Sequence, residues 1–412
     1  MRFQSIEKLR GLACLLIILH HTHHPTIDYN WLPLGMRQGW AGVHVFFVIS
    51  GFVVALYMLR IMDDVEGPTF LARLIQKRGV IVEFLVRRFF RLAPVAVLGL
   101  AFIAACFSLF NFLEPLALSH PARMFQVFRT LAETLVPVYN LTISTYGFSD
   151  ANRLCLAPYW SLSIEDQFYL LLPLLFVAIP SNSSRFRFAL IASAVGAFVV
   201  RPLFHVLFTH VYTINALYSH TITNFDGLFL GVALGLLFAE LAATGAPAGR
   251  PSSRSSWLAG AIVVLSFVFI WLYPSRHGEG TDRGRNVMHV YILVAALSGL
   301  SVWLCATFER RGRDILHFPI IGPVLDYLGA RSYTLYVFHM MVAKVARYAI
   351  VDPRWDSDPY RPLILAGVFI GLLLTVTEAV HRLVELPMRE LGKRYAATFR
   401  KTPEAVATAL SG

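Results

Sequence analysis

The stretch Trp40–Leu59, WAGVHVFFVISGFVVALYML, decides the fold class, because it runs for 20 residues without an Asp, Glu, Lys or Arg. A helix of about 20 apolar residues crosses the hydrocarbon core of a bilayer. The apolar residues follow one another and do not alternate with polar ones, which favours a helix over a barrel strand. We therefore interpret this stretch as a transmembrane helix.

The composition of the whole chain is also unusually apolar. Of 412 residues, 56% are hydrophobic, 13% are aromatic and only 15% are charged, whereas about a quarter of the residues in a typical soluble domain are charged. These figures exclude a soluble enzyme, a disordered chain, a collagen and a coiled coil. Because a backbone in lipid must satisfy its own hydrogen bonds, we expect an all-α, polytopic bundle of transmembrane helices.

Ten segments are apolar enough to be predicted as spans. They are Ile6–His23, Trp40–Leu59, Leu92–Phe112, Trp160–Ile179, Phe188–Phe208, Ile222–Leu241, Trp257–Tyr273, His289–Phe308, Ser332–Ile350 and Pro362–Leu383. An eleventh segment, Leu131–Leu141, is short and is interrupted by Glu133 and Pro137. The charges of the connecting segments decide whether it crosses.

With ten spans, both termini lie on one side, and that side carries 24 Lys and Arg residues against nine on the other. This asymmetry is what the positive-inside rule requires. We therefore expect both termini to be cytoplasmic, in the cell (inner) membrane, with Leu113–Tyr159 as a long outer or re-entrant segment. Residues 1–390 are predicted to form one membrane domain, followed by a short basic tail at 391–412.

The net charge of +11 and the four cysteines suggest no further partner or metal. In a membrane protein, basic loops set the topology and contact anionic lipid, so nucleic acid is not an expected partner. Cys14, Cys106, Cys155 and Cys305 are scattered without a CxxC pair. We predict neither a disulfide framework nor a metal site.

Ionisable residues within spans are costly unless they face a partner or a wet cavity, and each is therefore a candidate site residue. Arg10 and His21 are eleven residues apart, which is three helical turns plus roughly 20° and about 16 Å along the axis. His21 therefore shares a stripe with Arg10, while His20 points about 80° away. The alternative is that His21 only caps the helix in interfacial water.

Further polar residues are expected in the same outer half of the bundle. A histidine and a carboxylate that converge in a low-dielectric pocket can deprotonate a hydroxyl. For Glu165 and Asp226 the alternative is a structural ion pair with a basic neighbour. The candidates for this pocket are His44, Trp160, Ser161, Glu165, Tyr169, Asp226 and His339.

Arg88 and Arg91 share a helical face on the expected cytoplasmic side, before the third span. Guanidinium groups at this spacing suit phosphates. The alternative is that they lie at the lipid headgroups, as arginines of inner loops commonly do. The sequence contains no Gly-rich phosphate loop, no HExxH and no GxSxG motif.

Several of these segments together resemble the acyltransferase type 3 family of integral membrane O-acyltransferases. The matching segments occur in the family's order, and Leu9–Leu12 with His21 is similar to its motif of an arginine and a histidine separated by ten residues. The others are Gly42–Phe52, Arg88–Arg91, Tyr159–Tyr169, Asn224–Leu228, Ser332–His339 and Glu385–Arg389. Two positions depart from the family pattern: His44 stands where aspartate is frequent, and Asn224 where arginine is frequent.

The resemblance implies a ten-helix enzyme that moves an acyl group, usually acetyl, from a cytoplasmic thioester such as acetyl-CoA. The acceptor would be a hydroxyl of a glycan, a lipid-linked sugar or a secondary metabolite. It further implies that Arg10 and His21 are the catalytic pair, that Glu165 belongs to the site, and that Arg88 and Arg91 contact the donor. Acyl-CoA would be a co-substrate, and no bound cofactor is expected.

Two alternatives stay open at this point. A covalent acyl intermediate on His21 would serve the same transfer. Intramembrane His, Glu and Asp residues are also the elements of proton relays, so a proton-coupled exporter or flippase of a small glycan-like molecule is the competing class. Against an exporter, the sequence has no evident inverted repeat or matched pair of broken helices.

Overall fold

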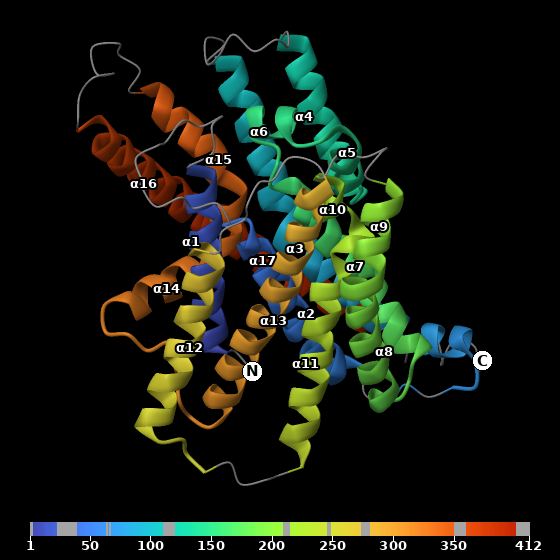
Figure 1. Ribbon diagram of the computed structural model, residues 1–412. Coiled ribbons are helices and arrows are strands. Elements are labelled where there is room, and N and C mark those ends of the chain that lie inside the picture. Colours follow the sequence, from blue (N-terminus) through green and yellow to red (C-terminus); the bar gives the residue numbers. More distant parts are fainter. Residues whose placement is uncertain are drawn as a thin grey trace.

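The computed structural model describes residues 3–22, 39–62, 65, 67–109, 120–208, 215–244, 249–272, 281–349 and 360–400. Every regular element in these residues is a helix, and the long helices stand side by side in a bundle (Figure 1). His23, which was predicted to end the first span, lies outside the described residues.

Within the described residues, eight helical segments are long and apolar enough to cross a membrane, which confirms a polytopic helical membrane protein. Single helices supply α2 (Ala41–Ile61), α3 (Phe70–Leu109), α7 (Tyr159–Ala178), α11 (Phe225–Ala243), α12 (Ser253–Leu272) and most of α13 (Thr281–Arg310). The other two segments are composite: α8 (Asn182–Val195) continues through η1 (Gly196–Val200) into α9 (Arg201–Phe208), and α16 (Arg361–Val380) through η4 (His381–Glu385) into α17 (Leu386–Arg400).

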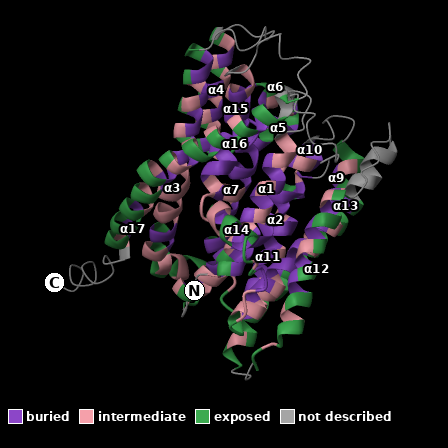
Figure 2. Cartoon of the chain, turned by 90° about the vertical axis from the view of Figure 1, so that its left-hand side faces the viewer, coloured by how far each residue is buried: buried purple, intermediate pink, exposed green. Residues whose placement is uncertain are grey.

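Two predicted spans form helices that are too polar to count among these eight. They are α1 (Gln4–Thr22), which carries Glu7, Lys8 and Arg10 near its start, and α15 (Ser332–Ala349), which carries Lys344 and Arg347. Both lie inside the bundle and pack against each other, so protein shelters much of their polar surface (Figure 2). The ten-span count and the cytoplasmic termini remain predictions.

The connection Arg60–Arg91, expected to be a cytoplasmic segment, is for the most part helical. The α3 helix begins at Phe70 and continues for 40 residues, with Pro94 in its interior. The α17 helix packs along the first half of α3, where Gly79 meets the carbonyl of Phe399. Residues 391–400, predicted to belong to a basic tail, are therefore part of a packed helix, and 401–412 lie outside the described residues.

The segment between α3 and α7 contains three short helices, α4 (His120–Leu135), α5 (Tyr139–Tyr146) and α6 (Ser149–Arg153). Neither α4 nor α5 is long enough to span a bilayer. Gln167 Nε2 donates a hydrogen bond of 2.6 Å to the carbonyl of Pro137, in the turn between α4 and α5. Because Gln167 lies about 12 Å along α7, this contact supports the re-entrant alternative for the segment.

Small residues bring α2 and α11 into backbone contact. A Cβ atom added to Gly51 would lie 2.0 Å from the carbonyl oxygen of Leu228, and one added to Gly231 would lie 2.1 Å from that of Val48. Such close helix approach is typical of membrane interfaces that use small residues. It holds Ser50, the neighbour of Gly51, in a set position.

We predict that Gly51→Leu destabilises the bundle, because the new side chain has to push α2 away from α11. Overpacking of this kind costs about 1–3 kcal/mol or more. Gly371→Leu on α16 is the matched control, since nothing lies within 4 Å of its added Cβ. Thermal unfolding in detergent should show a lower midpoint for Gly51→Leu only; equal midpoints would contradict the contact.

Candidate functional site

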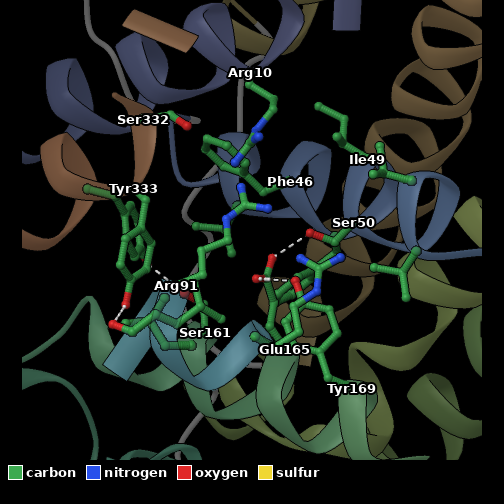
Figure 3. A pocket seen from close by; sticks show the side chains of 18 residues that line it. Arg10, Phe46, Ile49, Ser50, Arg91, Ser161, Glu165, Tyr169, Ser332 and Tyr333 are labelled. Atoms are coloured by element: carbon green, nitrogen blue, oxygen red, sulfur yellow. Dashed lines mark hydrogen bonds between the residues drawn. The ribbon is translucent and has the colours of Figure 1, made fainter. Parts of the chain in front are cut away.

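A cavity lies between α1, α2, α3, α7 and α15 (Figure 3). It holds about 720 Å³ of atom-free space, part of it open to the surroundings. Its polar lining residues are Arg10, Ser50, Arg88, Arg91, Ser161, Glu165, Tyr169, Ser332, Tyr333 and Tyr336. The structure thus brings together six candidates predicted from the sequence. They are Arg10, Arg88, Arg91, Ser161, Glu165 and Tyr169.

Three arginines give the cavity its positive charge. Arg88 and Arg91 project from α3, whose unbroken helix at this point fixes them on one face. The guanidinium of Arg88 stacks on the ring of Tyr169 at 4.6 Å. Neither Arg88 nor Arg91 forms an ion pair with any residue that the structure describes, while Arg10 has Glu7 at 3.6 Å. The arrangement is suited to a polyanion.

Glu165 is held by hydroxyl groups at the edge of this cavity. Ser50 Oγ donates a hydrogen bond of 2.8 Å to Oε1, and Tyr169 hydroxyl donates one of 3.0 Å to Oε2 (Figure 3). Both carboxylate oxygens therefore accept hydrogen bonds from neutral groups. Glu165 thus lies with the arginines, and its described hydrogen bonds go to Ser50 and Tyr169 rather than to a histidine.

His21 is paired with a second histidine. Its Nδ1 lies 3.1 Å from Nε2 of His339 and 3.0 Å from the carbonyl oxygen of Ile17. His339 is 1% exposed, and its own Nδ1 lies 2.7 Å from the carbonyl oxygen of Tyr336. A carbonyl can only accept a hydrogen bond, so both Nδ1 atoms carry protons. The single Nδ1 proton of His21 is then shared by two acceptors, the Ile17 carbonyl oxygen and His339 Nε2, and the lone pair of His21 is on Nε2.

The histidine pair sits one helical turn beyond the cavity. Tyr336, which lines the cavity, lies one turn before His339 on α15. Its hydroxyl is 2.7 Å from Ser161 Oγ, so that α15 and α7 are joined by a hydrogen bond at the cavity wall. The site therefore has two parts, a cationic cavity and a histidine pair, with Tyr336 common to both.

Other candidates lie apart from the cavity. His44 packs its ring against those of Trp40 and Tyr291 at 5.5 and 4.9 Å, and Trp160 against Tyr218 at 4.5 Å. Asn224 donates hydrogen bonds to nearby carbonyls. The rings form an aromatic cluster beside the site, and Asn224 binds the backbone of that cluster at Tyr218. None of His44, Trp160 and Asn224 lines the cavity.

Asp226 forms a buried ion pair at 3.0 Å with Arg201, which follows the π-helical turn η1. Arg201 is 1% exposed, and its guanidinium lies 4.1 Å from the ring centre of Tyr291. This geometry matches the structural alternative for Asp226. Arg201 was not among the candidates predicted from the sequence, although a charge within a span is itself a signal of a partner.

In the part of the chain that the structure describes, no three His, Cys, Asp or Glu side chains are grouped so as to hold a metal ion. The four cysteines are buried and unpaired by disulfides.

Comparison with known proteins identifies the family of the chain. The family model for an acyltransferase domain matches residues 3–379, and the chain therefore belongs to this family of integral membrane acyltransferases. Sequence relatives are a Staphylococcus aureus (strain COL) protein provisionally named an O-acetyltransferase, at 24% identity, and the peptidoglycan O-acetyltransferase OatA of Listeria monocytogenes, at 25%. Each alignment covers 94% of this chain, and 57% and 56% of the relative.

The chain thus spans a little more than half the length of these relatives. A further relative is the O-acetyltransferase OatA of Staphylococcus aureus (strain MRSA252), which is 24% identical; that alignment covers 98% of this chain and 60% of the relative. No solved structure matches the chain.

We predict that Asp226→Ala lowers stability rather than substrate affinity, because it leaves the Arg201 charge buried without a partner. Breaking a buried pair in this way costs about 3–5 kcal/mol. Glu390→Ala is the control, since Glu390 is half-exposed and its pairs with Lys393 and Arg394 lie at the surface. Thermal unfolding in detergent should separate the two; an unfolding midpoint unchanged by Asp226→Ala would contradict a structural role.

Proposed function

We propose that this protein is a membrane O-acetyltransferase that takes an acetyl group from acetyl-CoA and transfers it to a hydroxyl of a cell-surface glycan. The observation that carries the proposal is the cavity lined by Arg10, Arg88 and Arg91, with the His21–His339 pair one helical turn beyond its Tyr336 wall. An anionic thioester and a general base can then meet within one protein-lined site. The name of the Listeria relative, a peptidoglycan O-acetyltransferase, supports a glycan acceptor.

In this proposal the pyrophosphate of the donor binds Arg88 and Arg91. Arg10 and His21 are about 16 Å apart along α1, so the pantetheine arm would extend through the cavity toward the histidines. The hydrogen bond between Ser161 and Tyr336 has to open for the thioester to pass. Glu165, which accepts from Ser50 and Tyr169, keeps the arginine side of the cavity polar and its walls in place.

The transfer step requires one proton to move twice. Nε2 of His21 takes the proton of the acceptor hydroxyl while the hydroxyl oxygen bonds to the thioester carbonyl carbon. The carbon–sulfur bond then breaks, and the imidazolium returns the proton to the leaving thiolate, which gives the ester and free CoA thiol. A charged His21 donates a stronger hydrogen bond from Nδ1, and Nε2 of His339 is placed to accept it.

We predict that His21→Ala lowers kcat by about 100-fold or more, which is the lower range of what a general base contributes. Purified protein in lipid nanodiscs is supplied with acetyl-CoA and glycan oligosaccharides, and thiol release and acetylated product are measured together. His317→Ala, a change at an exposed histidine, is the control. Full transfer by folded His21→Ala would contradict the mechanism. In a parallel measurement with the native protein in closed lipid vesicles, glycan uptake without thiol release would identify an exporter.

In this proposal His339 is a positioning residue, and its variants test the hydrogen bond that it accepts from His21. His339→Phe keeps an aromatic ring but removes one of the two acceptors for Nδ1 of His21 and leaves only the Ile17 carbonyl, so we expect kcat to fall about 10- to 100-fold, as for other partners that orient a reacting imidazole. The donor KM should change little. His339→Gln supplies an amide oxygen at a similar reach and should restore most of the rate; equal rates for both variants would contradict the assigned hydrogen bond.

A further inference from the structure

A second cavity lies at the end of the bundle where α1 begins and where α2 and α11 end (Figure 1). It holds about 1100 Å³ of atom-free space, part of it open to the surroundings. Its wall contains three aromatic rings, Phe3, Tyr57 and Phe238, and two charged side chains, Glu7 and Arg60.

This cavity adjoins the site described above. Val53 lines both cavities. Glu7 on the wall of the second cavity is 3.6 Å from Arg10, which lines the first. A ligand that fills the arginine cavity would extend past Val53 into the second one, where the Glu7 carboxylate has Arg10 as its ion-pair partner.

The two charged residues of the second cavity are not equivalent. Arg60 is exposed, near the end of α2, and forms no ion pair or hydrogen bond with any described residue. Tyr57 lies one turn earlier on α2 and presents a ring to the same space. A cation beside aromatic rings is the chemistry that recognises a phosphorylated nucleoside, because the rings stack on a base and the guanidinium binds a phosphate.

We propose that the second cavity binds the nucleotide end of the acyl donor, with the base against Phe3 and Tyr57 and the ribose 3′-phosphate on Arg60. The inference rests on the proposed function and deepens it. In coenzyme A the 3′-phosphate sits on the ribose next to the pyrophosphate. A donor whose pyrophosphate lies on Arg88 and Arg91 therefore carries its third phosphate into the neighbouring cavity. The protein would then select free coenzyme A thioesters over donors that lack this phosphate.

The test compares coenzyme A with 3′-dephospho-coenzyme A, which differs only in the phosphate assigned to Arg60. Affinities are measured by calorimetry on the full chain in nanodiscs, without an acceptor. We expect the native protein to bind coenzyme A about 10- to 100-fold more tightly, as a charged hydrogen-bonded contact allows. Arg60→Gln should lose this preference while keeping its affinity for the dephospho form.

Arg254→Gln, at another exposed arginine, is the control and should keep the preference. Thermal unfolding identifies any variant that fails to fold; Arg60→Lys, which retains the charge, then replaces Arg60→Gln and should retain only part of the preference. Equal affinity of the native protein for the two ligands would overturn the assignment. An equal loss of affinity for both ligands in Arg60→Gln would also overturn it, because that is the result expected if Arg60 binds lipid headgroups.

The same ligands separate this inference from the proposed function. If coenzyme A binds with the Arg60-dependent preference but no hydroxyl is acetylated, the nucleotide site stands and the transfer reaction is wrong. If transfer occurs at equal kcat/KM from acetyl-CoA and its 3′-dephospho form, the reaction stands and the nucleotide site is wrong.

Discussion

The cost of placing charge inside a membrane is the constraint on which this structure depends. A guanidinium or imidazole at membrane depth has to be enclosed by protein or solvated in a cavity. Here α1, which is too polar to count as a span by its own composition, is packed among α2, α13, α14 (Ile321–Ala330) and α15. Lys8, 1% exposed, forms an ion pair with Asp314. The polar helix is stable in the bundle because its neighbours supply ion-pair and hydrogen-bond partners, which lipid tails cannot.

The same constraint explains the difference between the two kinds of charged residue in the bundle. Arg201 is fully enclosed and has a carboxylate, a carbonyl and an aromatic face as partners. Arg88 and Arg91 have no ion-pair partner among the described residues, and they line an open cavity. A charge that is paired inside the protein supports the fold, whereas clustered like charges beside open space are arranged for a ligand.

Backbone continuity determines where the site residues stand. Since α3 passes unbroken from Phe70 through Pro94, the backbone positions of the two arginines that it carries are fixed relative to each other. The α17 helix packs against the first half of α3 and braces it. On the opposite wall, Ser50 is set by the close contact of α2 with α11, and it in turn fixes Glu165. The cavity is thus built from rigid helices rather than loops.

The sequence by itself determined the helical membrane class, the family resemblance and the common stripe of Arg10 and His21, because apolar run length, motif order and helical period are local properties. It also indicated the arginines of α3 and the i, i+4 pair Glu165 and Tyr169. It named no hydrogen-bond partner for Glu165. Only the tertiary structure decided that His21 meets His339, 318 positions away, and that Glu165 meets Ser50. Helical periodicity says which side chains share a face, but the partner across that face depends on how helices distant in sequence pack, and no local pattern encodes it.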